Sequence, residues 1–265
     1  MTPPYRNFPY PLNVLMHVIA REGGSGSAMH YGVFAREGES LGAAQERSTE
    51  LLFGRLPPPP RRVLEVGTGL GATLDRLTRS GYAAVGITPD PSQAAEARRR
   101  FGEDLPVRVA ALETFEEAQA FEVIVFQESS QYIPSAVLWD RVRRLCVPSG
   151  RVIVLDEFAL RPVERANPLP ALDAFIEAAR AEGFRVEEEV DLSREAAPTV
   201  SWFLERLPRH RRSIEDELAV SSGQVDELVA SGEAYRELYG RGDYGYRLLA
   251  FREGSGASSG LSYIL

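Results

Sequence analysis

The chain has 265 residues, of which 44% are hydrophobic and 26% charged, and its formal net charge at pH 7 is -8. This composition is typical of a soluble globular protein with one large domain, or one domain and a cap. The negative charge argues against a nucleic acid partner, because phosphate binding needs a concentrated cationic surface. No apolar run is long enough to span a bilayer, no signal-peptide pattern occurs and Cys146 is the single cysteine, so we expect a cytoplasmic protein with no membrane partner.

Residues 1–56 are expected to form an N-terminal lid and helices ahead of the core. Their first 42 residues show weak periodicity, and Gly23–Ser27 contains only Gly and Ser, which predicts a loop that could act as a hinge. A helix is predicted over Gly42–Leu56, because the four prolines at 57–60 would end it.

Residues 57–192 alternate between apolar runs and helical patterns. The runs are nearly unbroken in branched apolar residues, which indicates parallel strands buried on both faces. The predicted strands are Arg62–Val66, Tyr82–Ile87, Val107–Ala111, Phe121–Phe126, Arg151–Asp156 and Phe184–Val190. The predicted helices are Leu70–Ser80, Pro91–Phe101, Pro134–Cys146 and Leu169–Glu182.

The pattern changes after residue 192. Residues 193–240 are charged and mostly helical in pattern, a last strand is predicted over Tyr244–Phe251 within residues 241–253, and residues 254–265 predict a mobile tail. These elements predict an α/β fold: a Rossmann-like, seven-stranded, mostly parallel sheet with helices on both faces, plus a helical cap inserted before the last strand.

The stretch Glu65–Gly71 leads from a predicted buried strand into three alternating glycines, and a helix follows at once. Glycine lets the backbone approach a ligand closely and adopt dihedral angles closed to other residues. The first turn of a helix also offers free N–H groups. The residues alone leave two cofactors open: a dinucleotide such as NAD, through Gly67, Gly69 and Ala72, or S-adenosylmethionine.

The spacing Glu-x-Gly-x-Gly-x-Gly resembles motif I of class I S-adenosylmethionine-dependent methyltransferases. The resemblance implies that the amino-acid end of the cofactor is held by the turn, whose residues are Gly67, Thr68, Gly69 and Gly71. It also implies that Glu65, on the strand just before the turn, orients the cofactor ammonium group.

The ends of the second and third predicted strands narrow this resemblance to one branch of the family. Most methyltransferases carry an acid at the position of Thr88, whereas the branch of cyclopropane-fatty-acid synthases and several natural-product methyltransferases has Thr or Ser there and a Gln matching Gln93. The resemblance implies that Thr88, Pro89 and Gln93 contact the cofactor, and that Ala111 and Leu112 border its adenine.

The ends of the fourth and fifth strands resemble sugar O-methyltransferases and geranyl diphosphate C-methyltransferases of that branch. The resemblance implies a cofactor contact for Gln127, and its catalytic candidates are Glu128, Gln131, Tyr132 and Glu157. The sugar enzymes have a His base at the position of Gln131, and Gln cannot accept a proton. An O-methylation would therefore rely on Glu157 as the carboxylate base, or on His17, His30 or a tyrosine of the lid.

The stretch Met29–Gly32 is similar to a His-Tyr-Gly segment that folds over the cofactor in the cyclopropane-synthase branch. The resemblance implies that Tyr31 contacts the cofactor and takes part in catalysis. Three scattered His and one Cys offer no metal-ligand spacing, so no metal is expected.

These observations predict a methyltransferase that uses S-adenosylmethionine to methylate a small organic metabolite, with an N- or O-acceptor favoured, in natural-product biosynthesis. A different possibility is C-methylation through a carbocation, stabilised by Glu128 and aromatic faces. The candidate faces are Tyr31, Tyr132, Tyr235, Tyr239, Tyr244 and Tyr246. The sequence also leaves open an NAD-dependent oxidoreductase and a cofactor-binding protein without catalysis, and a homodimer is considered as the assembly.

Overall fold

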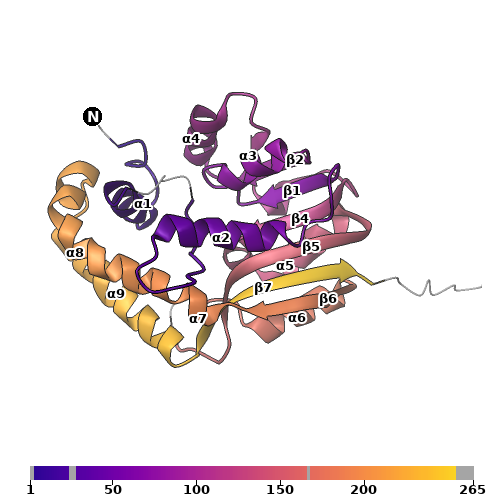
Figure 1. The fold of residues 1–265 in the computed structure, drawn as a ribbon. Coiled ribbons are helices and arrows are strands. Elements are labelled where there is room, and N and C mark those ends of the chain that lie inside the picture. Colours follow the sequence, from indigo (N-terminus) through magenta and orange to yellow (C-terminus); the bar gives the residue numbers. More distant parts are fainter. Residues whose placement is uncertain (1–2, 24–27, 166–167, 255–265) are drawn as a thin grey trace, which may run out of the picture.

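The computed structural model describes residues 3–23, 28–165 and 168–254. Most of the loop predicted over Gly23–Ser27 (residues 24–27) and most of the tail predicted over residues 254–265 (residues 255–265) lie outside these described residues. Within them, seven strands form one sheet in the order β3-β2-β1-β4-β5-β7-β6 (Figure 1).

The sheet is mostly parallel, as predicted. Its strands are β1 (Arg62–Val66), β2 (Ala83–Thr88), β3 (Val107–Val109), β4 (Phe121–Gln127), β5 (Cys146–Ala159), β6 (Phe184–Asp191) and β7 (Tyr244–Glu253). The first five strands pair in parallel, and β7 runs antiparallel between β5 and β6. The carboxyl ends of the parallel strands therefore meet at one edge, where α/β sheets bind their ligands.

Helices cover both faces of the sheet (Figure 1). They are α1 (Leu12–Arg21), α2 (Leu41–Phe53), α3 (Ala72–Arg79), α4 (Pro91–Phe101), α5 (Ser135–Leu145), α6 (Leu172–Ala181), α7 (Ser193–Ala196), α8 (Pro198–Leu218) and α9 (Ser222–Gly240), with 3-10 turns η1 (Leu112–Thr114) and η2 (Ser130–Tyr132). The apolar sides of α5 and α6 pack on one face of the sheet. The apolar sides of α2, α3 and α4 pack on the other.

The predicted helical cap consists of α7, α8 and α9, inserted between β6 and β7. Helix α1 packs against α8 through apolar side chains that include Val14, Val18, Leu207 and Ile214. Figure 1 shows α1, α8 and α9 beyond the carboxyl edge of the parallel strands. The division into units at residues 1–56, 57–192, 193–240 and 241–253 stays a prediction.

Several predicted boundaries differ from the structure. Helix α3 begins at Ala72 rather than Leu70, because Gly71 before it is left-handed, with φ 84°. Strand β3 ends at Val109, because the chain then turns into η1, and β5 begins at Cys146, which already pairs with Phe121 of β4. Helix α2 ends at Phe53, ahead of the prolines expected to stop it.

Candidate active site

The glycine turn between β1 and α3 has the tight geometry that its sequence predicts. Gly67, Gly69 and Gly71 have φ of 73°, 53° and 84°, a region that only glycine adopts readily. A Cβ on Gly67 would overlap the Cβ of Ser129, and a Cβ on Gly69 would overlap the end of Met29. Close packing thus adds to the dihedral requirement at Gly67, whereas at Gly69 the flexible end of Met29 could move aside.

Glu65 and Thr68 form a buried polar pair at the start of this turn. The Thr68 hydroxyl donates to Glu65 Oε2 at 2.5 Å, and both residues are buried. Burial raises the pKa of Glu65 to about 7, and the Thr68 hydrogen bond only partly opposes this. A ligand ammonium group at this carboxylate would supply the missing positive charge.

The ends of β2 and β3 lie beside the turn. The Thr88 hydroxyl donates to Gln93 Oε1 at 3.0 Å, so the predicted Thr-Gln pair is formed in the structure. The backbone N–H of Ala110 donates to the Thr88 carbonyl at 2.9 Å, which sets Ala111 and Leu112 beside the end of β2. Pro89 is exposed at the same edge.

A chain of side chains ties Gln127, at the end of β4, to the N-terminal segment. The Thr73 hydroxyl donates to Gln127 Oε1 at 2.8 Å, and Gln127 Nε2 donates to Thr49 Oγ1 at 3.2 Å. Thr49 Oγ1 in turn lies 3.2 Å from His30 Nε2. Since His30 Nδ1 faces the Tyr31 carbonyl at 3.0 Å, Nδ1 carries the proton and Nε2 accepts from Thr49.

The segment 28–34, called the lid segment below, lies against the carboxylates at the strand ends. The backbone N–H of Tyr31 donates to Glu128 Oε1 at 2.5 Å, and the Tyr246 hydroxyl donates to the same oxygen at 2.7 Å. Glu128 has φ 54°, an uncommon left-handed conformation for a residue with a side chain. Burial, and then the charge of Glu157, raise the pKa of Glu128 well above its usual range.

Glu157, at the end of β5, faces the helical cap. The Tyr239 hydroxyl of α9 donates to Glu157 Oε1 at 2.5 Å. Burial raises the pKa of Glu157 to about 7, although hydrogen bonds from Tyr239, Tyr235 and Tyr31 favour the ionised form. A carboxylate with a pKa near neutrality suits a general base.

Aromatic rings from three parts of the chain surround the two glutamates. The ring of Tyr31 is stacked on Tyr246 at 5.9 Å between centroids and on Tyr239 at 6.4 Å. Tyr235 packs at 5.9 Å from Tyr239. Ring faces carry negative potential, so rings and carboxylates together favour positive charge.

The remaining catalytic candidates have other environments. The Gln131 N–H donates to Asp156 Oδ2 at 3.2 Å, whereas the side chain of Tyr132 is 78% exposed. His17 lies in the contact between α1 and α8, where its Nε2 is 2.9 Å from Ser213 Oγ. The rings of His17 and His30 are thus hydrogen-bonded to other groups, and their role as bases stays a prediction.

Sequence reasoning missed several residues of this network. Asp156 precedes the predicted base directly and has no exposed surface, yet its role required knowing which turn it faces. Thr49 and Thr73 lie on helices, and no local pattern indicates their link to Gln127.

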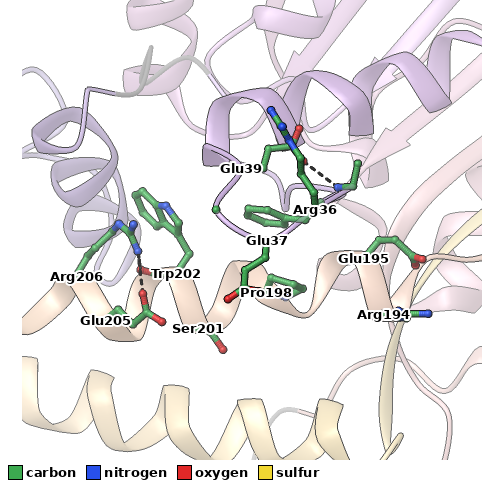
Figure 2. A pocket seen from close by; sticks show the side chains of 13 residues that line it. Arg36, Glu37, Glu39, Arg194, Glu195, Pro198, Ser201, Trp202, Glu205 and Arg206 are labelled. Atoms are coloured by element: carbon green, nitrogen blue, oxygen red, sulfur yellow. Dashed lines mark hydrogen bonds and ion pairs between the residues drawn. The ribbon is translucent and has the colours of Figure 1, made fainter.

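A groove of about 770 Å³ opens outside the lid segment, between the loop after it and α7 and α8 (Figure 2). Trp202 and Pro198 contribute apolar surface. The charged side chains of the lining are of both signs: Arg36, Arg194, Arg206, Glu37, Glu39, Glu195 and Glu205. None of the predicted site residues lines this groove. Met29 and Tyr31 instead pack directly over the glycine turn and the glutamates.

The sequence predicts neither a metal site nor a membrane-spanning segment. Among the described residues, no group of three or more His, Cys, Asp or Glu could hold a metal ion. No helix in this same part of the chain is long and apolar enough to cross a membrane.

Comparisons with known proteins agree with this geometry. Residues 64–154 match the family model of a methyltransferase domain, and no curated protein matches the sequence. In structure, the chain is similar to the cyclopropane synthase MmaA2 from Mycobacterium tuberculosis, with 18% identity and a TM-score of 0.79 over 95% of this chain and 99% of that one. It is also similar to the [4+2]-cyclase SpnF, with 23% identity and a TM-score of 0.77 over 96% and 98% of the two chains.

A third similar structure is the geranyl diphosphate C-methyltransferase from Streptomyces coelicolor A3(2). It shares 16% identity and a TM-score of 0.69 over 94% of this chain and 95% of that chain. The family model thus shows a methyltransferase domain over residues 64–154, and the three structures confirm the predicted fold. The three proteins are named for different activities. The structural similarity therefore does not identify the reaction of this chain, which has to be argued from its own residues.

Proposed function

We propose that this chain, which contains a methyltransferase domain with the class I fold, binds S-adenosylmethionine and transfers its methyl group to a small organic molecule. The observation that carries the proposal is the glycine turn with its buried Glu65–Thr68 pair, next to the Thr88–Gln93 pair at the same sheet edge. These are the two motifs on which the resemblance to the cyclopropane-synthase branch depends.

The residues present fit this cofactor. The turn has no room for a side chain at Gly67, and the positive φ of Gly67 and Gly69 disfavours side chains at both positions, so backbone groups are what it offers to a ligand. Glu65 would hold the ammonium group, and Gln93, fixed by Thr88, would hold the ribose. Ala111 and Leu112 would border the adenine.

When bound, S-adenosylmethionine supplies a methyl group on a sulfonium, which is a good leaving group. The protein then has to orient the acceptor, exclude water and, for an N- or O-acceptor, take up a proton. We assign the proton to Glu157, because its carboxylate is buried beside the lid segment and its pKa of about 7 leaves part of it ionised at neutral pH. Tyr31 closes the site above it.

Titration calorimetry with S-adenosylmethionine, S-adenosylhomocysteine and NAD tests the cofactor. We expect both sulfur compounds to bind and NAD to give no heat. The missing ribose acid at Thr88 counts against both cofactors, but only the methyltransferase branch has a Gln that matches Gln93. Binding of NAD alone would replace this proposal with an oxidoreductase. Failure of all three to bind would reject it.

A carbon acceptor is the second candidate, and the tyrosine stack favours it. The rings of Tyr31, Tyr239 and Tyr246 beside Glu128 and Glu157 would stabilise a carbocation. A screen with a methyl-labelled donor against amines, hydroxyl compounds and prenyl diphosphates separates the candidates. Label in a stable C–CH3 product would reject the N- or O-acceptor. Cofactor binding without any labelled product would favour a binding protein.

Replacing Gln93 with alanine is expected to weaken binding of S-adenosylmethionine about tenfold, the effect of one lost hydrogen bond to a ligand. Thr88 would also lose its side-chain partner. Ser92→Ala is the matched control, because Ser92 is exposed on the same turn of α4. Calorimetry measures both affinities, and an equal loss in the two variants would show a general effect on the helix start.

A further inference from the structure

The carboxylate of Asp156 is close to both candidate glutamates, because Asp156 precedes Glu157 in the chain and its side chain binds the turn that follows Glu128. It belongs to β5, directly before Glu157, and none of its surface is exposed. Successive side chains of a strand point to opposite faces, so Asp156 and Glu157 diverge from one backbone position. Asp156 faces the turn that follows β4, while Glu157 faces the tyrosines.

Four donors surround Asp156, and none of them carries a charge. Oδ2 accepts from the Ser130 backbone N–H at 2.8 Å, from the Ser130 hydroxyl at 2.6 Å and from the Gln131 N–H at 3.2 Å. Oδ1 accepts from the Glu157 N–H at 2.8 Å. One side chain therefore satisfies the buried donors that start η2 and also fixes the backbone of Glu157.

The turn that Asp156 holds includes the strained residue Glu128. A left-handed residue with a Cβ costs of order 1–3 kcal/mol and persists only where its surroundings enforce it. Around Glu128 (φ 54°) the constraints are its own N–H donating to the Leu155 carbonyl at 2.9 Å, and the Ser129 hydroxyl donating to the Val66 carbonyl at 2.5 Å. The bonds from Ser130 and Gln131 to Asp156 complete them.

We propose, on the basis of the function proposed above, that Asp156 is a positioning residue that holds the Glu128–Gln131 turn against the end of β5 and thereby fixes both glutamate carboxylates. Through this turn, the Glu128 carboxylate is placed to accept from the Tyr31 N–H and the Tyr246 hydroxyl. Asp156 itself needs no contact with substrate or cofactor for this role.

Asp156 also acts on the two glutamates through its charge. Its negative charge contributes to the raised pKa of Glu128 and to that of Glu157, in both cases after the larger effect of burial. Besides burial, the charge of Asp156 also contributes to the raised pKa of Tyr132 in η2 and of Tyr246 in β7. Arg247 lies opposite Asp156 on β7, but its guanidinium is bound to Asp191 at 2.6 Å.

The test is the substitution Asp156→Asn, which removes the charge and keeps one acceptor oxygen for Ser130. Its NH2 group takes the place of the oxygen that accepts from the Glu157 N–H, so the variant also loses that bond. Titration of δ-carboxyl 13C-labelled glutamates by NMR should show Glu128 and Glu157 losing their protons at lower pH, by about half a pH unit or more. The pH dependence of kcat should shift in the same direction, with kcat about tenfold lower and KM for S-adenosylmethionine within about twofold of wild type.

Asp140→Asn, the same change on the surface of α5, is the control and should leave both titrations in place. Unshifted glutamate titrations in a folded Asp156→Asn protein would overturn the proposal, as would wild-type kcat together with an unshifted pH profile. The NMR readout needs no methyl transfer. A shifted titration in a protein that binds no S-adenosylmethionine would therefore refute the proposed function and leave the role of Asp156 intact.

Discussion

Replacing Gly67 with alanine should lower the free energy of unfolding by about 2–5 kcal/mol and weaken S-adenosylmethionine binding more than tenfold. Two effects add up at this position. Its φ of 73° costs any residue with a Cβ about 1–2 kcal/mol, and the new Cβ would overlap Ser129 Cβ in a closely packed turn. Either the turn or the end of β4 must shift, and both border the proposed cofactor site.

Gly242→Ala is the matched control for this prediction. Gly242 has φ 70°, nearly the same as Gly67, but a Cβ there would meet no atom within 4 Å. It should therefore show the dihedral cost alone, about 1–2 kcal/mol, with cofactor affinity unchanged. Chemical denaturation gives the stabilities and calorimetry gives the affinities. Equal losses of stability in the two variants would contradict the packing argument.

A second substitution separates the clash from the strain. Combining Gly67→Ala with Ser129→Gly removes the atom that the new Cβ meets, so the double variant should be more stable than the sum of the two single losses predicts. Ser129→Gly alone also loses the hydrogen bond from the Ser129 hydroxyl to the Val66 carbonyl, which the cycle takes into account. Strict additivity would show that the two sites do not interact.

The turn illustrates what local sequence can predict. Alternating glycines after an apolar strand specify a dihedral pattern within a few residues, and the structure has a positive φ at all three of Gly67, Gly69 and Gly71. The strands around it were equally predictable, because burial on both faces gives unbroken apolar runs. The bounds of helix α1 do not follow from the weak periodicity of the first 42 residues, although Val14 and Val18 have the i, i+4 spacing of its buried face.

The residues that were missed depend on contacts between distant parts of the chain. Thr49 joins Gln127 across 78 positions, and Tyr239 joins Glu157 across 82. Tyr239 was one of six tyrosines considered as aromatic faces, and no local pattern separates it from Tyr132, which is exposed. The predicted ends of strands are wrong where pairing with a neighbouring strand decides them. Strand β5, for example, extends to Cys146 because Cys146 pairs with β4 there.

Replacing Glu157 with glutamine should lower kcat by about 100-fold or more and yet make the protein without ligand more stable at pH 8. The loss of turnover is expected because glutamine cannot take up a proton. The gain of stability is expected because burial raises the pKa of Glu157 from 4.5 to about 7. A carboxyl group raised in this way stabilises the fold fully below its unfolded pKa, and that contribution is lost as the pH rises through about 7.

At pH 8 the wild-type carboxylate is ionised in both the folded and the unfolded state, so the folded state retains a buried charge. Glutamine has no charge, and its Oε1 can still accept from the Tyr239 hydroxyl. The variant should therefore be more stable at pH 8 by roughly 1–3 kcal/mol, and this advantage should shrink as the pH falls toward 5. Glu65 has a raised pKa in both proteins, so its contribution cancels in the difference.

Denaturation curves between pH 5 and pH 8.5, for wild type, Glu157→Gln and the exposed control Glu237→Gln, measure this difference. Glu237→Gln should follow the wild-type pH dependence, because its side chain is exposed on the same helix that carries Tyr239. A Glu157→Gln variant that keeps full turnover would remove Glu157 as the base. If Glu128→Gln also kept full turnover, neither Glu128 nor Glu157 would take part in methyl transfer. Lost turnover with an unchanged pH dependence of stability would mean that the carboxylate is ionised at little cost, so that its burial could not supply a base with a pKa near neutrality.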